Sequence, residues 1–210
     1  MDTIKICRET DALVIVDVQN DFMPGGALAV PRGDEVVPVI NALAGHFDNA
    51  VFTKDWHPAG HISFASSHPG KKPFETITLP YGEQVLWPDH CVQGTKGAEL
   101  HVGLSIPHAR FIQKGYHPYT DSYSAFKEAD GTSTGLGDSL RARGIKRLFF
   151  VGLATDYCVA WSAMDARRER FGVLVIEDAC RAIDMNGSLA KAWQDMSALQ
   201  VGRIISSQIA

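Results

Sequence analysis

Short apolar runs rich in β-branched and aromatic residues recur along the chain and predict the strands of a buried sheet. They cover residues 12–18, 50–54, 110–114, 147–153 and 173–177. Their apolar residues are largely continuous and do not alternate with polar ones. We therefore expect these strands to be covered on both faces, as in a parallel sheet.

Helical spacing of apolar residues separates these strands and predicts helices. Two sets show this spacing: Val36, Val39, Ile40, Leu43 and Phe47, and then Leu189, Ala192, Trp193, Met196 and Leu199. Pro38 places the start of the first helix close to itself. A third helix is predicted over residues 156–170, with Thr155 as its N-cap, arginines in its last turn and Gly172 just beyond it.

The alternation of strands and helices predicts the fold class. It indicates an α/β protein, a three-layer α/β/α single domain over residues 1–210, with a central, mostly parallel sheet and right-handed crossovers. One stretch, at about residues 55–109, interrupts the alternation and is rich in His, Pro and Gly. Long irregular segments in compact domains are often functional, so we expect this one to bind metal and substrate.

Composition narrows the class of function. The chain has 210 residues, 24 acidic and 20 basic, a formal net charge of −4 and a hydrophobic fraction of 45%. No basic stripe favours nucleic acid or an anionic membrane. No apolar run reaches the ~18 residues of a membrane span, and residues 1–11 lack the apolar core of a signal peptide. We therefore expect a cytoplasmic protein with a small-molecule partner.

The cysteines indicate a reducing environment. Cys7, Cys91, Cys158 and Cys180 lie far apart and form no CxxC pair. This spacing argues against a zinc ribbon, a thioredoxin-like redox pair and a disulfide scaffold. We expect four free thiols.

Four reactive side chains follow the predicted strands. Asp17, Asp55 and Lys114 stand at or just after the ends of three strands, and Cys158 lies five residues beyond a fourth. Each alone has an ordinary interpretation as a turn residue, a solvated lysine or a small buried thiol. In an open parallel sheet, however, the carboxyl ends of the strands meet at one edge, where ligands bind. The four together therefore predict a catalytic site.

Charge and placement suggest their roles. With Thr155 as N-cap, Cys158 is at the third helical position, where the helix dipole and the ammonium of Lys114 favour a nucleophilic thiolate. Asp17 can take the thiol proton and later deliver it to a leaving amine. Backbone N–H groups from Ala154 to Cys158 can hold the oxyanion of an acyl transfer.

A second group of residues has the character of a metal site. Asp55, His57 and His90 offer one carboxylate and two imidazoles, a set typical of Zn, Fe or Mn, and His61 is a further candidate. A lone histidine in this segment would more simply be a polar loop residue. Three aromatic residues, Phe22, Trp87 and Tyr123, can enclose a flat ring, or can be ordinary packing.

At this point the motifs resemble those of a known family. The segments are 17–22 (DVQNDF), 54–58 (KDWHP), 87–91 (WPDHC), 113–115 (QKG) and 152–159 (GLATDYCV). Together they are similar to nicotinamidases, within the isochorismatase-like cysteine hydrolases. The match runs in order from about Asp11 to about Asp178. It implies an isochorismatase-like fold with a Rossmann-like strand order.

The resemblance also implies a mechanism. Cys158 would be the nucleophile, Asp17 the acid/base and Lys114 the thiolate stabiliser. A cis Leu153–Ala154 peptide would accompany an oxyanion hole of the Ala154 and Cys158 N–H groups. A divalent ion, zinc or iron before manganese, would bind the pyridine nitrogen. The expected reaction turns nicotinamide into nicotinate and ammonia through a thioester, in pyridine nucleotide (NAD) salvage, with pyrazinamide as a further substrate.

Within this resemblance, the ligands of the metal would be Asp55, His57 and His90. His61 is a metal ligand in some relatives and not in others. Phe22 and Trp87 match residues of the substrate pocket, and Tyr123 matches less closely. All three are therefore candidate pocket residues.

Two alternatives stay open at this stage. Another amidohydrolase of the superfamily would use the same Asp, Lys and Cys on a ureido or N-carbamoyl substrate. A noncatalytic protein would use Cys158 as an oxidation sensor, or the metal site as a structural clip. The sequence leaves metal identity, substrate breadth and oligomeric state open, a homo-oligomer included.

Overall fold

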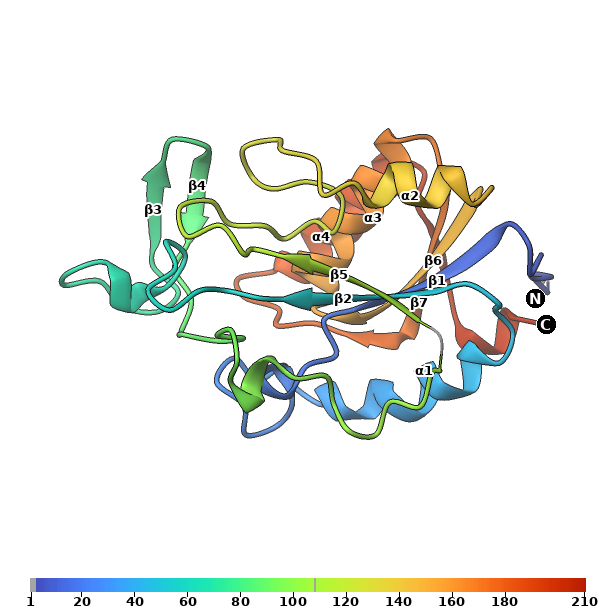
Figure 1. Cartoon of the computed structure of the whole chain (residues 1–210), viewed down its shortest axis with the longest axis horizontal. Helices are drawn as coiled ribbons and strands as arrows, with labels where there is room; N and C mark the ends of the chain where they lie inside the picture. The colour runs from blue at the N-terminus through green and yellow to red at the C-terminus, as the bar shows by residue number, and fades with distance from the viewer. Residues whose placement is uncertain (1–2, 108) are drawn as a thin grey trace.

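The computed structural model describes residues 3–107 and 109–210, and its centre is a six-stranded parallel sheet (Figure 1). The strands lie in the spatial order β5, β2, β1, β6, β7, β8. Their bounds are β1 Asp11–Val16, β2 Ala50–Asp55, β5 Arg110–Lys114, β6 Arg147–Leu153, β7 Gly172–Arg181 and β8 Gly202–Ile204. Counted along the chain, this is the doubly wound order 3-2-1-4-5-6. The expected Rossmann-like order is confirmed.

Helices cover both faces of the sheet and complete three layers. Helix α1 (Val36–Ala44) lies below the sheet in Figure 1, and α2 (Leu136–Ala142), α3 (Ala160–Arg168) and α4 (Ser188–Ala198) lie on the other side. Side chains of β1 alternate between the apolar cores on the two faces of the sheet. Leu13 and Ile15 pack with α1, and Val14 and Val16 pack with the helices on the opposite face. The three-layer α/β/α fold expected from the sequence is confirmed.

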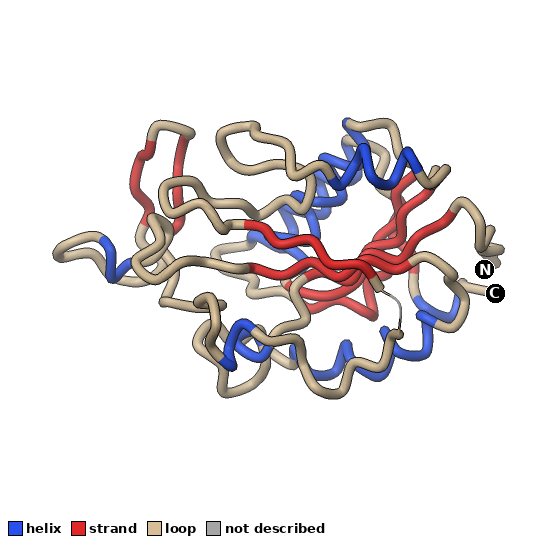
Figure 2. Tube along the Cα trace, viewed as in Figure 1, coloured by secondary structure: helices blue, strands red, loops and turns tan. Residues whose placement is uncertain are grey.

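All five predicted strands exist, with shifts at some of their ends. The first strand ends at Val16, two residues early, and β7 continues to Arg181. Among the described residues, four helices and strands have no counterpart in the sequence prediction: α2, β8, and two strands that form a hairpin, β3 (Thr76–Leu79) and β4 (Gly82–Val85). The hairpin interrupts the long irregular segment, which is drawn mostly in tan in Figure 2. The hairpin itself lies beyond the carboxyl ends of the sheet strands.

The helix after β6 begins differently from the prediction. A π-helical turn over Thr155–Val159 leads directly into α3, and its N-cap is Ala154. The prediction of Thr155 as N-cap is therefore wrong. The carbonyl of Ala154 accepts the N–H groups of Tyr157 and Val159, both at 3.1 Å. This backbone arrangement starts the helix one residue earlier and makes a side-chain cap unnecessary.

The other helix ends follow local chemistry. Helix α1 begins two residues before Pro38, which is tolerated because the first turn of a helix has no partner for that N–H. It ends at Ala44, so Phe47 packs from the following turn. Within the described ranges, none of the helices is long and apolar enough to cross a membrane.

Candidate active site

The ends of three strands and the π-helical turn bring four reactive side chains together around Lys114. Its Nζ lies 2.8 Å from Oδ2 of Asp17 and 3.2 Å from Sγ of Cys158. It also donates to a carboxylate oxygen of Asp55 and to the carbonyl of Ser122, at 3.1 Å for the latter. All four predicted side chains are at least nine-tenths buried. The structure thus assembles the predicted set in one place.

Lys114 remains charged in this buried place. Burial alone would lower its pKa, but the carboxylates of Asp17 and Asp55 more than compensate, and the pKa lies well above the usual value. Asp17 follows β1 in the left-handed region, at φ 47°, which orients its carboxylate into the cluster. Thr53 donates its hydroxyl to that carboxylate and accepts the backbone N–H of Asp17.

The pKa values of the Cys158 thiol and of the Asp17 carboxyl are both raised. Burial raises the pKa of Cys158 well above its usual range; Lys114 acts in the opposite direction, but Asp17 and Asp55 add to the rise. Burial likewise raises the pKa of Asp17, against the opposing effect of Lys114. Burial thus favours the protonated thiol, whereas the helix and Lys114 favour the thiolate that the sequence analysis expects. Asp17 is also a stronger base than an exposed aspartate.

Backbone N–H groups line the same pocket beside the thiol. The Leu153–Ala154 peptide is cis, as the family resemblance implied. The N–H of Ala154 makes no hydrogen bond to any other residue in the described ranges. Ala154 and Cys158 both face the pocket. The position of Ala154 suits an oxyanion donor.

Asp55, His57 and His90 form a compact set of metal-ligand atoms. Nε2 of each histidine lies 3.8 Å from Oδ2 of Asp55. The opposite ring nitrogen, Nδ1, donates at 2.8 Å to a backbone carbonyl, that of Gly115 for His57 and that of Pro88 for His90. A carbonyl can only accept, so Nδ1 carries the proton and the Nε2 lone pairs are free to face Asp55. The set fits a divalent metal.

Gly115 is required by the position of His57. Its φ is +64°, and a Cβ at this position would lie 2.4 Å from Cε1 of His57. The glycine that follows Lys114 therefore lets the backbone approach the imidazole closely enough for its carbonyl to accept the Nδ1 proton.

His61 lies beside His57, with ring centroids 4.3 Å apart, but both its nitrogens are engaged. Nδ1 pairs with the hydroxyl of Ser63 at 2.7 Å, and Nε2 donates to the carbonyl of Thr120 at 3.2 Å. Burial, reinforced by His57, lowers the pKa of His61 to about 4, so the ring is neutral at pH 7. Its ligand atom can approach those of His57 and Asp121, but it does not belong to the Asp55 set.

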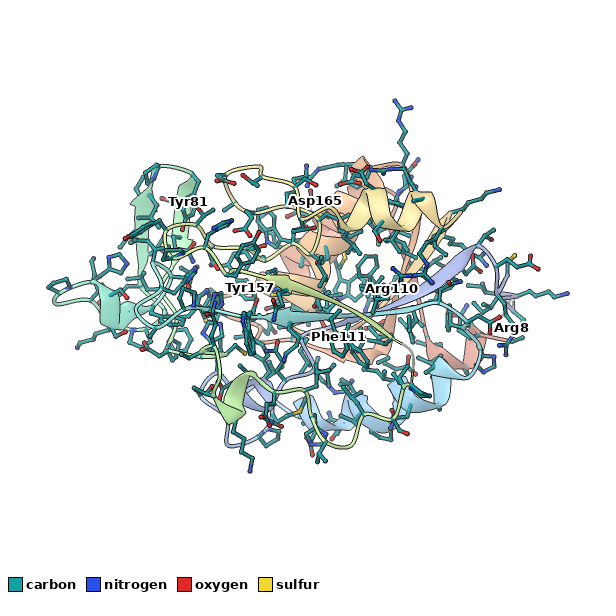
Figure 3. All side chains as sticks on the ribbon, viewed as in Figure 1. Arg8, Tyr81, Arg110, Phe111, Tyr157 and Asp165 are labelled. Carbon is teal, nitrogen blue, oxygen red and sulfur yellow. The ribbon has the colours of Figure 1, made fainter. Side chains whose placement is uncertain are left out.

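A pocket connects the thiol with the histidines. The predicted aromatic residues Phe22, Trp87 and Tyr123 all line it, and the indole N–H of Trp87 donates to the Tyr123 hydroxyl at 3.0 Å. Figure 3 labels Tyr157, near the centre of the view, which meets Trp87 edge to face. The sequence analysis missed five lining residues: Leu28, Asp121, Ser122, Tyr157 and Ile183. Only Tyr157, adjacent to the predicted nucleophile, had a usable sequence signal.

Comparisons with known proteins agree with this geometry. A family model described as the isochorismatase domain matches residues 11–209. The nicotinamidase of Acinetobacter baylyi is 60% identical over 94% of each chain. A solved nicotinamidase and pyrazinamidase of Acinetobacter baumannii superposes with a TM-score of 0.94, at 59% identity over 95% of this chain and 97% of that one. The zinc complex of a Pyrococcus horikoshii pyrazinamidase has a TM-score of 0.76 at 36% identity, over 93% of this chain and 98% of its own.

Proposed function

The chain belongs to the isochorismatase family and is an amidohydrolase acting on nicotinamide, and we propose that Cys158, Asp17 and Lys114 carry out this reaction. The observation that carries the proposal is the position of one ammonium group between a base and a thiol. Nζ of Lys114 contacts both Oδ2 of Asp17 and Sγ of Cys158, and Cys158 lines a pocket that also contains a metal-ligand set.

In the first step, Sγ of Cys158 attacks the carboxamide carbon of nicotinamide while its proton passes to Asp17. As the S–C bond forms, the π electrons of the carbonyl group move to its oxygen. The backbone N–H groups of Ala154 and Cys158 stabilise the resulting oxyanion. Lys114 keeps its charge throughout. Moving the proton to Asp17 avoids placing a third anion in the buried cluster.

In the second step, the tetrahedral intermediate collapses. The C–N bond breaks, the amine takes the proton held by Asp17, and ammonia leaves a nicotinoyl thioester on Cys158. Asp17, again a carboxylate, then accepts a proton from water as the water oxygen attacks the thioester carbon. The S–C bond breaks, the sulfur takes the proton held by Asp17, and nicotinic acid leaves and ionises to nicotinate.

The remaining residues hold and orient the ring. Asp55, His57 and His90 would hold one divalent ion, for which we propose zinc or iron, with manganese as a further candidate. When bound, the ion supplies a Lewis-acidic coordination position for the pyridine nitrogen. Phe22, Trp87 and Tyr123 enclose the ring. Pyrazinamide combines the same carboxamide with a ring nitrogen, so we propose it as a second substrate.

We also propose that the chain acts as one domain in the cytoplasm, in the salvage of pyridine nucleotides. All four cysteines are free thiols in the described structure, and the reaction requires one of them to remain reduced. Reducing compartments maintain such thiols.

Ammonia release from nicotinamide tests the proposal directly. We expect Cys158→Ala to reduce turnover by more than about 10³-fold, because no other group replaces the sulfur. The matched control is Cys7→Ala, at an exposed thiol, which should retain full turnover. Removal of the metal by a chelator should raise the KM for nicotinamide or abolish activity. Full turnover by Cys158→Ala would refute the nucleophile, and full activity of metal-free protein would refute the ring-binding role.

A further inference from the structure

A second cavity of about 280 Å³ adjoins the active-site pocket. The two share Asp121 and Tyr123, which form the wall between them. The second cavity lies between the turn of the β3–β4 hairpin, the loop that follows Tyr123, and α3. Figure 3 labels one residue at each side of it: Tyr81 on the hairpin and Asp165 on α3.

Glu128 is a buried carboxylate without a partner in this cavity. Its exposed fraction is only 4%, yet within residues 3–107 and 109–210 neither of its carboxylate oxygens has a hydrogen-bond donor. Its backbone is fixed, because its N–H donates to the carbonyl of Thr132 and its own carbonyl accepts the N–H of Gly131, both at 2.9 Å. Burial raises the pKa of Glu128. A carboxylate held so firmly without a donor is unusual in a folded protein.

The other buried carboxylates around the cavity are satisfied. Asp165 accepts from Arg168 at 2.7 Å. Asp121 accepts from the amide of Gln84 and from a backbone N–H, both at 2.8 Å. The missing donor is therefore specific to Glu128.

The lining favours an ammonium group over a metal ion. Among the described residues, the ligand atoms of Glu128 do not come together with those of Asp121 and Asp165 closely enough to surround one ion. Aromatic rings of Tyr81, Tyr123 and Trp161 lie among the lining residues instead. Aromatic faces together with a carboxylate form the environment that proteins use for organic ammonium ions.

We propose that this cavity is a binding site for an ammonium group, which donates hydrogen bonds to Glu128 and packs against the aromatic lining. Two possible ligands carry such an ammonium group. One is the ammonium ion formed when the ammonia product takes up a proton, since the cavity adjoins the active-site pocket. The other is a primary alkylammonium ion from solution. The site itself does not depend on the proposed reaction.

Titration calorimetry of the metal-loaded protein tests the proposal. Ammonium chloride and n-butylammonium chloride are the two probes; potassium chloride and 1-butanol are the references for charge and for shape. Each titration is run with and without saturating nicotinate, so that binding in the active-site pocket is recognised. We expect saturable binding of at least one probe that persists with nicotinate. Binding of ammonium alone would indicate the product, and binding of butylammonium alone an external amine.

Two variants assign the binding to the cavity. Glu128→Gln should weaken it about tenfold or more, whereas Glu83→Gln, at an exposed carboxylate of the same lining, should change it by less than about twofold. Unchanged nicotinamide turnover confirms that the variants are folded. If Glu128→Gln does not fold, Trp161→Ala replaces it and should weaken binding about threefold or more. The proposal is overturned if neither probe binds saturably, if potassium binds equally well, or if the folded cavity variant binds as the parent does.

Discussion

Nζ of Lys114 lies 3.2 Å from Sγ of Cys158, and the same nitrogen contacts two buried carboxylates. The ammonium group of Lys114 therefore interacts with two carboxylates and with a thiol that becomes negative when it loses its proton. With Asp17 and Asp55 ionised, the cluster already carries one excess negative charge, and a free thiolate would add another. This balance accounts for the raised pKa of Cys158, and it is consistent with the proposal that Asp17 takes the thiol proton.

Lys114→Met tests this balance. The variant leaves two buried carboxylates without their cation, so we expect a loss of about 3–5 kcal/mol in the free energy of unfolding. We also expect the pH profile for alkylation of Cys158 to move to higher pH, because the thiolate loses its stabilising charge. Lys191→Met, at an exposed lysine, is the control. An unchanged alkylation profile would contradict the role of Lys114.

The buried thiols predict a pattern of reactivity with pH. Burial raises the pKa of Cys180 to about 12, above an ordinary thiol. The folded state therefore favours the neutral thiol, and this contribution to stability is present below the unfolded pKa near 9 and is lost as the pH rises toward 12. At about pH 8.5, peptide mapping by mass spectrometry should show alkylation of exposed Cys7 but not of Cys180. Alkylation of Cys180 in the native protein would contradict the burial.

The sheet and the clustering of Asp17, Asp55, Lys114 and Cys158 were predictable because their signals are local. Most of the predicted strands are apolar runs. The edge strand β5 is the exception: most of its residues are exposed, so the expectation that it is covered on both faces is wrong. Asp17, Asp55 and Lys114 stand at strand ends, where the topology of a parallel sheet brings side chains together. The β3–β4 hairpin gave no such signal. It is a separate two-stranded unit with largely exposed residues, so no apolar pattern marks it.

Other features depend on tertiary contacts and left no pattern. The N-cap was placed on Thr155 because its hydroxyl is a good cap, whereas the structure uses the carbonyl of Ala154. The sequence analysis did not single out Asp121, which lines two cavities and accepts a hydrogen bond from Gln84 of the folded hairpin. The raised pKa of Cys158 likewise follows from burial, which the sequence does not specify.

The two neighbouring histidines should differ in metal binding. His57→Asn removes a free Nε2 from the Asp55 set, so we expect it to lose most of its metal. His61→Asn should retain the metal, because both nitrogens of His61 already bond to Ser63 and Thr120. Metal analysis of the purified variants measures this. Loss of metal from His61→Asn, in protein that is otherwise folded, would identify His61 as a ligand.

Gly115→Ala tests the backbone support of the metal site. A Cβ would lie 2.4 Å from the ring of His57, and the positive φ disfavours alanine independently. We expect the imidazole to be displaced and metal affinity to fall about 10- to 100-fold, as for loss of an outer hydrogen bond to a ligand. Gly131→Ala is a matched control, because it also has a positive φ but no atom within 4 Å of its Cβ. Equal metal affinity in the two variants would contradict the steric argument.

The hydrogen bond from Trp87 to Tyr123 should control the binding of the substrate ring. Tyr123→Phe keeps the aromatic wall but removes the acceptor 3.0 Å from the indole N–H, which leaves a buried donor unpaired at a cost of about 1–3 kcal/mol. Since the indole then loses its fixed orientation, we expect the KM for nicotinamide to rise about three- to tenfold with little change in kcat. Tyr81→Phe is the matched control: its hydroxyl donates to Gln84, at 3.1 Å, outside the active-site pocket. Steady-state kinetics of both variants tests this prediction. An equal rise in KM in Tyr81→Phe would show that the loss of either tyrosine hydroxyl near the hairpin has the same effect, and would contradict a specific role of the hydrogen bond from Trp87 to Tyr123.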